Sequence, residues 1–482
     1  MTRSGTLSIL LIAVALSVFI SPFQRELYVG DETKYAQVIR EVRAGAFFLP
    51  TLHGQPFTHK PPVHFWMIDL LTYPLGVYST WAFVLPSLSA FLFLLWLMWR
   101  MEGPLAAFVC GTALMVWGSA QTARMDVTFT ALIVLAAYLM RRGALVWSGV
   151  ALGVATLVKG PMAPVIGIFL FAFEWIRLRR RPSGKSLVAL AVMIAIPLLW
   201  FIPAMSVGGE SYTRDVLVKQ TMGRAVGAWV HKAAPWFYIV HAPADLFPWF
   251  FLAVVALVAV YKRGDEPSKF YISWILAVLV PYSLLSSKLD VYMMTMIPPV
   301  AALIARFLQG NDRWSEWGWR ANVLMLGILA GLGVAGFFIA PPEAKTLCVV
   351  LAAAAIVALI LSFRGRDVVT STLLVGVVPI IAFMYAAVFL IPTANEMAST
   401  RPAIRALMKQ NVPPEEIGLY WTPQLWSRDM PRQLERVRYD VVSAHPTVIV
   451  TSRKRAGDID LTGYRRVDQF QMIGKWFDVY RR

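Results

Sequence analysis

Long apolar runs recur along most of the chain and restrict its possible folds more than any other feature. Each run is roughly 17 to 23 residues long, enough for a helix to cross a hydrocarbon core of about 30 Å. Hydrophobic residues make up 58% of the 482 positions and charged residues only 15%, a balance that is rare in soluble globular proteins. The sequence therefore predicts a polytopic α-helical membrane protein.

The runs and the charges between them predict a topology. Alternate connections are short and basic, among them residues 141–142, 177–185, 261–269 and 364–366, and the positive-inside rule assigns them to the cytoplasm. The N-terminus is then cytoplasmic, and the chain beyond Pro392 lies outside. About thirteen spans are expected, near residues 6–21, 79–99, 104–119, 127–140, 144–158, 162–176, 186–203, 244–261, 270–285, 291–305, 322–340, 346–362 and 369–391.

The first apolar run, residues 7–20, resembles the hydrophobic part of a signal peptide preceded by Arg3. The sequence SPFQRE follows without a small-x-small cleavage site, so an uncleaved first span is expected. The two cysteines, Cys110 and Cys348, lie inside apolar runs and are predicted to be packing residues.

The net charge of +17 does not indicate nucleic-acid binding. The basic residues separate apolar runs instead of forming a face or a stripe, so membrane topology explains them better. Membrane lipids are the expected surroundings, and no nucleic-acid partner is predicted.

The polar parts of the chain suggest two domains. Residues 1–392 form the predicted transmembrane domain, with two long polar outer loops at residues 21–78 and 204–242. Residues 393–482 have a soluble composition, in which RPAIRALMKQ predicts an amphipathic helix and EIGLYW, TVIVTSRK and WFDVY predict short strands. We expect a small α/β domain on the outer face.

An acidic pair, Asp31 and Glu32, stands at the start of a predicted helix in the first outer loop. Two interpretations are open: the pair caps the helix and complements its dipole, or one carboxylate is a general base or a counter-charge at the membrane surface. The two roles are compatible. Apolar residues at i, i+3, i+4 and i+7 make this helix amphipathic and suited to lie on the membrane: Tyr35, Val38, Ile39 and Val42.

The segment FTHKPPVHFWMIDLL, residues 57–71, predicts a second helix that dips into the interface. Pro61 and Pro62 suit its first turn. Lys60 either extends to lipid headgroups or binds a phosphate, and Asp69 is expected to be a partnered structural residue.

Other charged residues interrupt the short outer loops. Lys288 and Tyr292, four residues apart, could form a phosphate clamp or belong to the interfacial belt of lysines and aromatics. Arg124, Asp126 and Lys159 pose the same question. Several charged outer edges that converge on one surface favour a binding site there.

A required metal is not predicted, although a divalent ion remains possible. The first long loop contains His53, His59 and His64, but no strict ligand spacing such as H-x-x-x-H occurs. Neither a glycine-rich phosphate loop nor a nucleophile elbow is present in the sequence.

Four motifs in order resemble the bacterial aminoarabinose transferase branch of the GT-C glycosyltransferases, to which protein O-mannosyltransferases are more distantly related. They are DETKYAQVIREVRAGAFFLPTLHGQPFTHKPPVHFW, ARMDVTFTALIVL, LVKGPMAPVI and SSKLDVYMMTMIPP, within residues 21–299. The resemblance implies a GT-C fold and an inverting transfer of a pentose, aminopentose or hexose from a polyprenyl-phosphate carrier, such as undecaprenyl phosphate. The implied acceptor is lipid A, a surface glycan or a protein, on the periplasmic face of the bacterial inner membrane.

The resemblance also implies roles for particular residues. Asp31 matches the catalytic carboxylate, with Glu32 beside it, and Lys288 and Tyr292 match a phosphate-binding pair. Lys60 keeps the family's position, whereas His59 stands where the family usually has Glu. Lys60, Lys288 and either Arg124 or Lys159 would then stabilise the leaving phosphate.

Two other functions compete with the transferase: a transporter or flippase for a polyprenyl-linked lipid or glycan, and a non-catalytic envelope assembly protein. Charges clustered at one surface, without repeat symmetry, argue against transport. The second long loop, with Arg214 and Arg224, could hold an anionic acceptor or contact anionic lipid headgroups.

Overall fold

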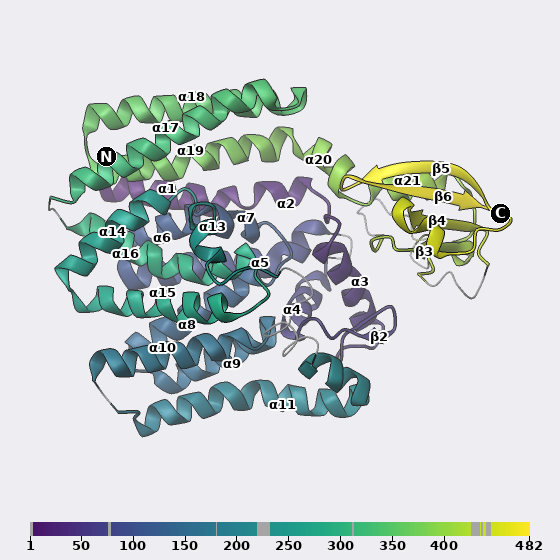
Figure 1. Ribbon diagram of the computed structural model, residues 1–482, viewed down its shortest axis with the longest axis horizontal. Helices are drawn as coiled ribbons and strands as arrows, with labels where there is room; N and C mark the ends of the chain where they lie inside the picture. The colour runs from purple at the N-terminus through teal and green to yellow at the C-terminus, as the bar shows by residue number, and fades with distance from the viewer. Residues whose placement is uncertain are drawn as a thin grey trace. The chain divides into compact units, whose positions relative to one another are not determined.

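Figure 1 shows the computed structural model of the chain, which describes residues 3–75, 79–179, 181–218, 232–310, 313–425, 434, 437–439 and 445–482. The chain divides into two compact units. The first comprises Met1–Ile20, Thr58–His64 and Val84–Ala387, and the second comprises Ser21–Phe57, Phe65–Phe83 and Val388–Arg482. Most of the first outer loop therefore clusters with the C-terminal part of the chain, from which it is remote in sequence.

The first unit is a bundle of α-helices (Figure 1). Its elements are α1 (Arg3–Ser17), α5 (Thr80–Glu102), α6 (Pro104–Thr112), α7 (Leu114–Ala120), α8 (Asp126–Arg141), α9 (Leu145–Lys159), α10 (Met162–Leu178), α11 (Gly184–Arg214), α13 (Phe237–Asp245), α14 (Phe250–Arg263), α15 (Glu266–Leu284), the 3-10 helix η2 (Asp290–Met296), α16 (Ile297–Gln309), α17 (Ser315–Ile339), α18 (Pro342–Gly365) and α19 (Val368–Phe389).

The multi-pass membrane architecture is confirmed, but the count of about thirteen spans is not. Within the described residues, seven helices are long and apolar enough to cross a membrane, or eight if α13 and α14, bent by 111°, form one span. Several predicted spans are shorter helices: α8 has 16 residues and is about 24 Å long at 1.5 Å per residue. The predicted span at 104–119 is divided at Ala113, whose extended backbone ends α6 and begins α7.

Small residues allow close helix packing in this unit. A side chain at Gly149 of α9 would lie 2.2 Å from the Ala189 carbonyl oxygen of α11, and one at Gly333 of α17 would lie 2.5 Å from the Ala352 nitrogen of α18. Because lipid tails are as apolar as the helices, close backbone approach supplies much of the attraction between them. Glycine at these two positions therefore permits helix contacts that alanine would disrupt.

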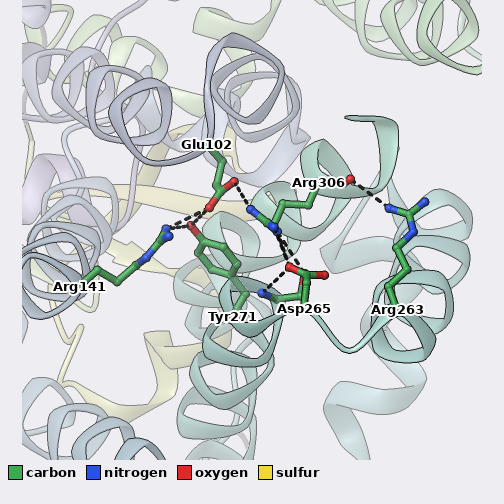
Figure 2. Close-up of polar contacts among 7 residues, drawn as sticks. Glu102, Arg141, Arg263, Asp265, Tyr271 and Arg306 are labelled. Carbon is green, nitrogen blue, oxygen red and sulfur yellow. Dashed lines mark hydrogen bonds and ion pairs between the residues drawn. The ribbon is translucent and has the colours of Figure 1, made fainter. Parts of the chain in front are cut away.

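A buried ionic cluster joins helix ends in the first unit (Figure 2). Glu102, at the end of α5, accepts hydrogen bonds from Arg141 of α8 at 3.0 Å, Arg306 of α16 at 3.0 Å and the Tyr271 hydroxyl of α15 at 2.7 Å. Arg306 also pairs with Asp265, the N-cap residue of α15, at 2.7 Å. The cluster thus ties the ends of four helices together.

The second unit combines helices with two small sheets. It contains α2 (Ile20–Gln24), α3 (Asp31–Arg43), the hairpin β1 (Thr51–Leu52) and β2 (Gln55–Pro56), most of α4 (Val63–Thr72), α20 (Ile391–Ala398), α21 (Arg401–Met408), the 3-10 helices η3 (Pro414–Glu416) and η5 (Arg453–Asp458), and the strands β3 (Ile417–Tyr420), β4 (Val448–Ser452), β5 (Arg465–Met472) and β6 (Lys475–Arg481). The larger sheet has the order β3-β4-β6-β5, with β3 and β4 parallel and the other pairs antiparallel.

The small C-terminal α/β domain predicted from the sequence is confirmed. Helix α21 contributes Ile404 and Leu407 to a core that includes Leu419 of β3 and Val450 of β4. The predicted strands correspond to β3, β4 and β6. Strand β5 was not predicted, because it lies at the sheet edge and five of its eight residues are exposed, which leaves little apolar alternation.

Candidate functional site

An apolar cavity of about 470 Å³ lies in the first unit. Its apolar lining comes mainly from α9, α10 and α11, with Leu157, Val165, Leu198 and Phe201 among the residues. Its polar lining residues include Thr58, His59, Lys60, Lys159, Tyr282, Ser287 and Tyr292. The cavity therefore combines a hydrophobic wall with basic and hydroxyl side chains from segments far apart in the sequence.

Three of the predicted site residues meet beside this cavity. Asp126 begins α8 and is buried, and its two carboxylate oxygens pair with Lys159 Nζ at 2.6 Å and Arg124 Nε at 3.3 Å. Lys159 ends α9, where a cation complements the helix dipole, as Asp126 does at the N-terminus of α8. Lys159, which lines the cavity, is thus held by a carboxylate behind it.

Two tyrosines form a stacked pair in the cavity lining. The rings of Tyr282 in α15 and Tyr292 in η2 are 5.1 Å apart and inclined by 21°. Lys159 Nζ lies 5.1 Å from the Tyr292 ring centroid, within cation–π range. Sequence reasoning found Tyr292 but missed Tyr282, because an aromatic residue inside an apolar helix gives no sign of the face it presents.

Lys288 differs from its predicted partner Tyr292 in its surroundings. Its side chain is buried, and its ammonium group donates to the Ser283 carbonyl oxygen at 3.0 Å and to that of Leu285. These carbonyls belong to the C-terminal end of α15, where a lysine satisfies acceptors that the helix leaves unpaired. Burial lowers the pKa of Lys288. Among the described cavity-lining residues, Ser287 and Tyr292 appear but Lys288 does not.

Lys60 and His59 enter the cavity lining from the segment before α4. Lys60 is half-buried and His59 is exposed. Helix α4 begins at Val63, so the two prolines precede the helix instead of forming its first turn. Lys60 and Lys159, nearly a hundred positions apart in the sequence, therefore line the same cavity.

Glu32 is a structural carboxylate of the second unit. Arg25 binds both of its oxygens at 2.6 Å, and the backbone N–H of Tyr28 donates to it at 2.9 Å. Both side chains of the ion pair are buried. With both carboxylate oxygens engaged, Glu32 fixes the chain that leads into α3.

Asp31 has a more open environment and is not the N-cap residue of the helix. The N-cap residue of α3 is Gly30, whose φ of 130° few other residues adopt. Asp31 is the first helical residue and not the N-cap that the capping interpretation expected, although its charge still complements the helix dipole. Asp31 Oδ1 lies 3.7 Å from Lys34 Nζ, and 42% of the Asp31 side chain is exposed.

Contacts to α20 hold the entry to α3. The Val29 N–H donates to the Ala398 carbonyl at 2.8 Å, and the Glu26 N–H donates to Asn395 Oδ1 at 3.1 Å. The Glu26 carboxylate pairs with Arg401. Asp31 is thus positioned by residues more than 360 positions later in the chain.

The remaining predicted residues lie elsewhere. Asp69 accepts from Arg43 Nε at 2.7 Å, which confirms that it is a partnered structural residue. Arg214 is exposed at the end of α11 and is not among the described lining residues, and Arg224 lies outside the described residues. In the part of the chain that the structure describes, no group of three or more His, Cys, Asp or Glu side chains could hold a metal ion.

The fold matches that of two solved structures of ArnT. The structure of ArnT from Cupriavidus metallidurans bound to undecaprenyl phosphate matches with a TM-score of 0.75, over 99% of this chain and 98% of that chain, at 20% sequence identity. Its apo structure matches with a TM-score of 0.76 at 19% identity, with the same coverage.

The sequence is similar to aminoarabinose transferases, as its motifs predicted. An undecaprenyl phosphate-alpha-4-amino-4-deoxy-L-arabinose arabinosyl transferase from Pectobacterium atrosepticum is 25% identical over 68% of this chain and 64% of its own length. The same-named protein from Pseudomonas paraeruginosa is 29% identical over 66% of this chain and 62% of its own length. The chain thus spans less than two thirds of these relatives, and no protein-family model matches it.

Proposed function

We propose that this protein is a glycosyltransferase that takes a sugar from a polyprenyl-phosphate carrier. The observation that supports this most directly is the cavity, which joins an apolar wall to Lys60, Lys159 and Tyr292. A polyprenyl phosphate has the same division, because its isoprene chain needs an apolar surface and its phosphate needs cationic or hydroxyl donors. The fold shared with ArnT, solved with undecaprenyl phosphate, agrees with this ligand class.

The chemistry would be a displacement at the anomeric carbon. An acceptor oxygen bonds to that carbon while the bond from the carbon to the phosphate oxygen breaks, with inversion, and polyprenyl phosphate leaves. Lys60 and Lys159 stabilise the extra negative charge on the leaving phosphate. Asp31 takes the proton of an acceptor hydroxyl or stabilises positive charge on the sugar.

The role of Asp31 follows from its difference from Glu32. Glu32 is buried and bound at both oxygens by Arg25, so it cannot accept a substrate proton without breaking that pair. Asp31 is half-exposed, its Oδ1 lies 3.7 Å from Lys34 Nζ, and it begins a helix whose entry is fixed by α20. A fixed and accessible carboxylate suits a general base.

We infer that the reaction takes place on the periplasmic face of a bacterial inner membrane, with a cytoplasmic N-terminus and a periplasmic domain at residues 393–482. The basic connections support this orientation. The acceptor is lipid A, a surface glycan or a protein side chain. The relatives' names, which specify an arabinosyl group linked to undecaprenyl phosphate, support a carrier-linked sugar as the donor.

The test is a gene deletion followed by mass spectrometry of the polar lipids. We expect a polyprenyl-phosphate sugar to accumulate, and a plasmid with the wild-type gene to remove it. The Asp31→Asn variant, shown to be folded and inserted, should not remove it. A folded Asp31→Asn protein that clears the lipid fully would exclude this carboxylate as the base, and an unchanged lipid profile on deletion would exclude the transferase.

A further inference from the structure

A histidine outside the proposed reaction, His241, lies beside the start of η2. Its ring nitrogen Nδ1 is 2.6 Å from Asp290 Oδ1. Because an ionised carboxylate only accepts hydrogen bonds, Nδ1 carries the hydrogen of this bond. His241 belongs to α13 and Asp290 is the first residue of η2, so the bond joins two elements that are 49 positions apart in the sequence.

Two other residues of α13 fix the surroundings of this imidazole. The Phe237 ring, one turn earlier, stacks on it with 3.8 Å between the ring centroids and an inclination of 27°. Asp245, one turn later, is buried and interacts electrostatically with both His241 and Asp290. Two carboxylates of like charge repel each other, and a donor bound to one of them reduces that repulsion. His241 therefore fixes where Asp290 lies relative to α13.

The same helix also holds the backbone that leads into η2. The buried Tyr238 accepts a hydrogen bond at its hydroxyl from the Leu289 N–H, at 3.4 Å. The Leu289 carbonyl oxygen accepts from the Tyr292 N–H at 3.0 Å. The first turn of η2 is thus bound to α13 at two neighbouring residues, Leu289 and Asp290, and this turn leads directly to Tyr292.

These contacts reach the cavity through the tyrosines of its lining. Tyr292 lines the cavity and stacks on Tyr282. Tyr238 packs edge-on against Tyr282, with 6.4 Å between the ring centroids. Ser287, earlier in the segment that leads into η2, lines the cavity as well. The segment that brings Ser287 and Tyr292 to the cavity is therefore the segment that α13 holds.

We propose, on the basis of the function above, that His241 and Asp290 are positioning residues for the carrier phosphate. Neither is among the described residues that line the cavity, so they act through Tyr292, whose place in the lining depends on where η2 begins. A hydroxyl binds a phosphate only within hydrogen-bond distance, so a small shift of η2 weakens that contact. The affinity for the carrier thus depends on a pair of side chains that the carrier does not touch.

Purified protein in lipid nanodiscs provides the test, with labelled undecaprenyl phosphate as the probe. His241→Leu keeps an apolar contact for Phe237 but removes the donor to Asp290, and it should lower the affinity about fivefold. His241→Asn, whose amide N–H can replace the Nδ1–H, should bind within about twofold of wild type. In a Tyr292→Phe protein, which itself binds more weakly, adding His241→Leu should cost less than about twofold.

The melting temperature separates positioning from a structural role. The His241 and Asp290 side chains are 39% and 53% exposed, so His241→Leu should leave the melting temperature close to that of wild type. A clear fall in melting temperature, with no recovery of affinity in His241→Asn, would make the pair structural only. Equal losses of affinity from His241→Leu with and without Tyr292→Phe would show that the pair does not act through Tyr292.

The same measurement distinguishes this inference from the proposed function. If wild type binds the probe and His241→Leu binds it equally well, His241 has no positioning role while the carrier function stands. If the folded wild-type protein does not bind undecaprenyl phosphate, the proposed function is wrong and the inference falls with it.

Discussion

Two ionic clusters occupy opposite ends of the same helices and differ in their charges. Helix α8 begins at Asp126 beside the cavity and ends at Arg141 in the Glu102 cluster. Helix α15 follows Asp265 in that cluster and carries Tyr282 of the cavity lining near its other end. The two clusters thus share helices α8 and α15, so a difference in their charges reflects a difference in their function.

The ion pairs of the Glu102 cluster are balanced: the carboxylates of Glu102 and Asp265 meet the guanidinium groups of Arg141 and Arg306. Tyr271 adds a neutral donor, and Arg263 donates to the Arg306 carbonyl oxygen at 3.3 Å (Figure 2). The cavity end instead brings three cations, Lys159, Arg124 and Lys60, near the buried carboxylate of Asp126, and two of them line a cavity. A cluster of paired charges between helix ends holds helices together. Cations that line a cavity are suited to an anionic ligand.

Breaking the balanced cluster should have the largest effect on stability. Glu102→Gln leaves the guanidinium groups of Arg141 and Arg306 without their shared carboxylate. We expect a loss of about 3 kcal/mol in the free energy of unfolding, at the lower end for a broken buried pair, because the two arginine side chains keep 28% and 24% of their surface exposed.

Thermal unfolding in detergent measures this change, and undecaprenyl-phosphate affinity below the melting temperature serves as the second readout. That affinity should stay within about twofold of wild type, since the ligand end keeps its charges. Loss of affinity without loss of stability would reverse the assignment of the two clusters.

Near the cavity end, a buried histidine should make the stability of the protein depend on pH. Burial lowers the pKa of His64, at the start of the short helix α4, from 6.5 to about 4, and the nearby charge of Lys60 lowers it further against opposing contributions from Ala123 and Asp126. Between pH 6.5 and about 4, His64 is therefore protonated in the unfolded chain but neutral in the folded chain. The contribution of His64 to the free energy of unfolding is at its maximum above pH 6.5 and decreases as the pH falls towards 4.

We expect the folded protein to be less stable at pH 4.5 than at pH 7.5 by about 2 kcal/mol on account of His64. Melting curves across this range measure the slope, and His64→Leu should flatten it, whatever its effect on stability at neutral pH. An equal slope in the variant would assign the pH dependence to other groups.

Removing one cation from the cavity end should weaken ligand binding without harming the fold. Lys60→Met keeps the length of the side chain and removes its charge, while Asp126 keeps Lys159 and Arg124. Affinity for undecaprenyl phosphate should fall about tenfold, or about 1.4 kcal/mol. The melting temperature should not fall, and a clear fall would mean that Lys60 is a structural cation like Arg306.

The smallest effect is expected at an exposed pair that belongs to neither cluster. Glu316 and Arg320 of α17 are 3.1 Å apart, with 53% and 57% of their side chains exposed. Glu316→Gln should change stability by about 0.3 kcal/mol and leave ligand affinity unaltered. This variant is the control for Glu102→Gln, because it makes the same chemical change in a solvated pair.

The sequence by itself determined the membrane class and the small C-terminal domain. These features depend on local properties: the length of apolar runs and the alternation of apolar residues in strands. Motif order also indicated the GT-C fold and led to Lys60, Lys159 and Tyr292, which line the cavity. Asp69 was correctly expected to have a structural partner.

Only the tertiary structure decided which side chains meet. Tyr282 faces the cavity because of how α15 is rotated against its neighbours, and Lys288 turns back to the end of α15 because unpaired carbonyls are there. Gly30 rather than Asp31 is the N-cap residue of α3, and Glu102 gathers its partners from three other helices. The period of apolar residues specifies which face of a helix is apolar. The rotation of that helix against its neighbours and the depth of each side chain depend on packing against distant segments.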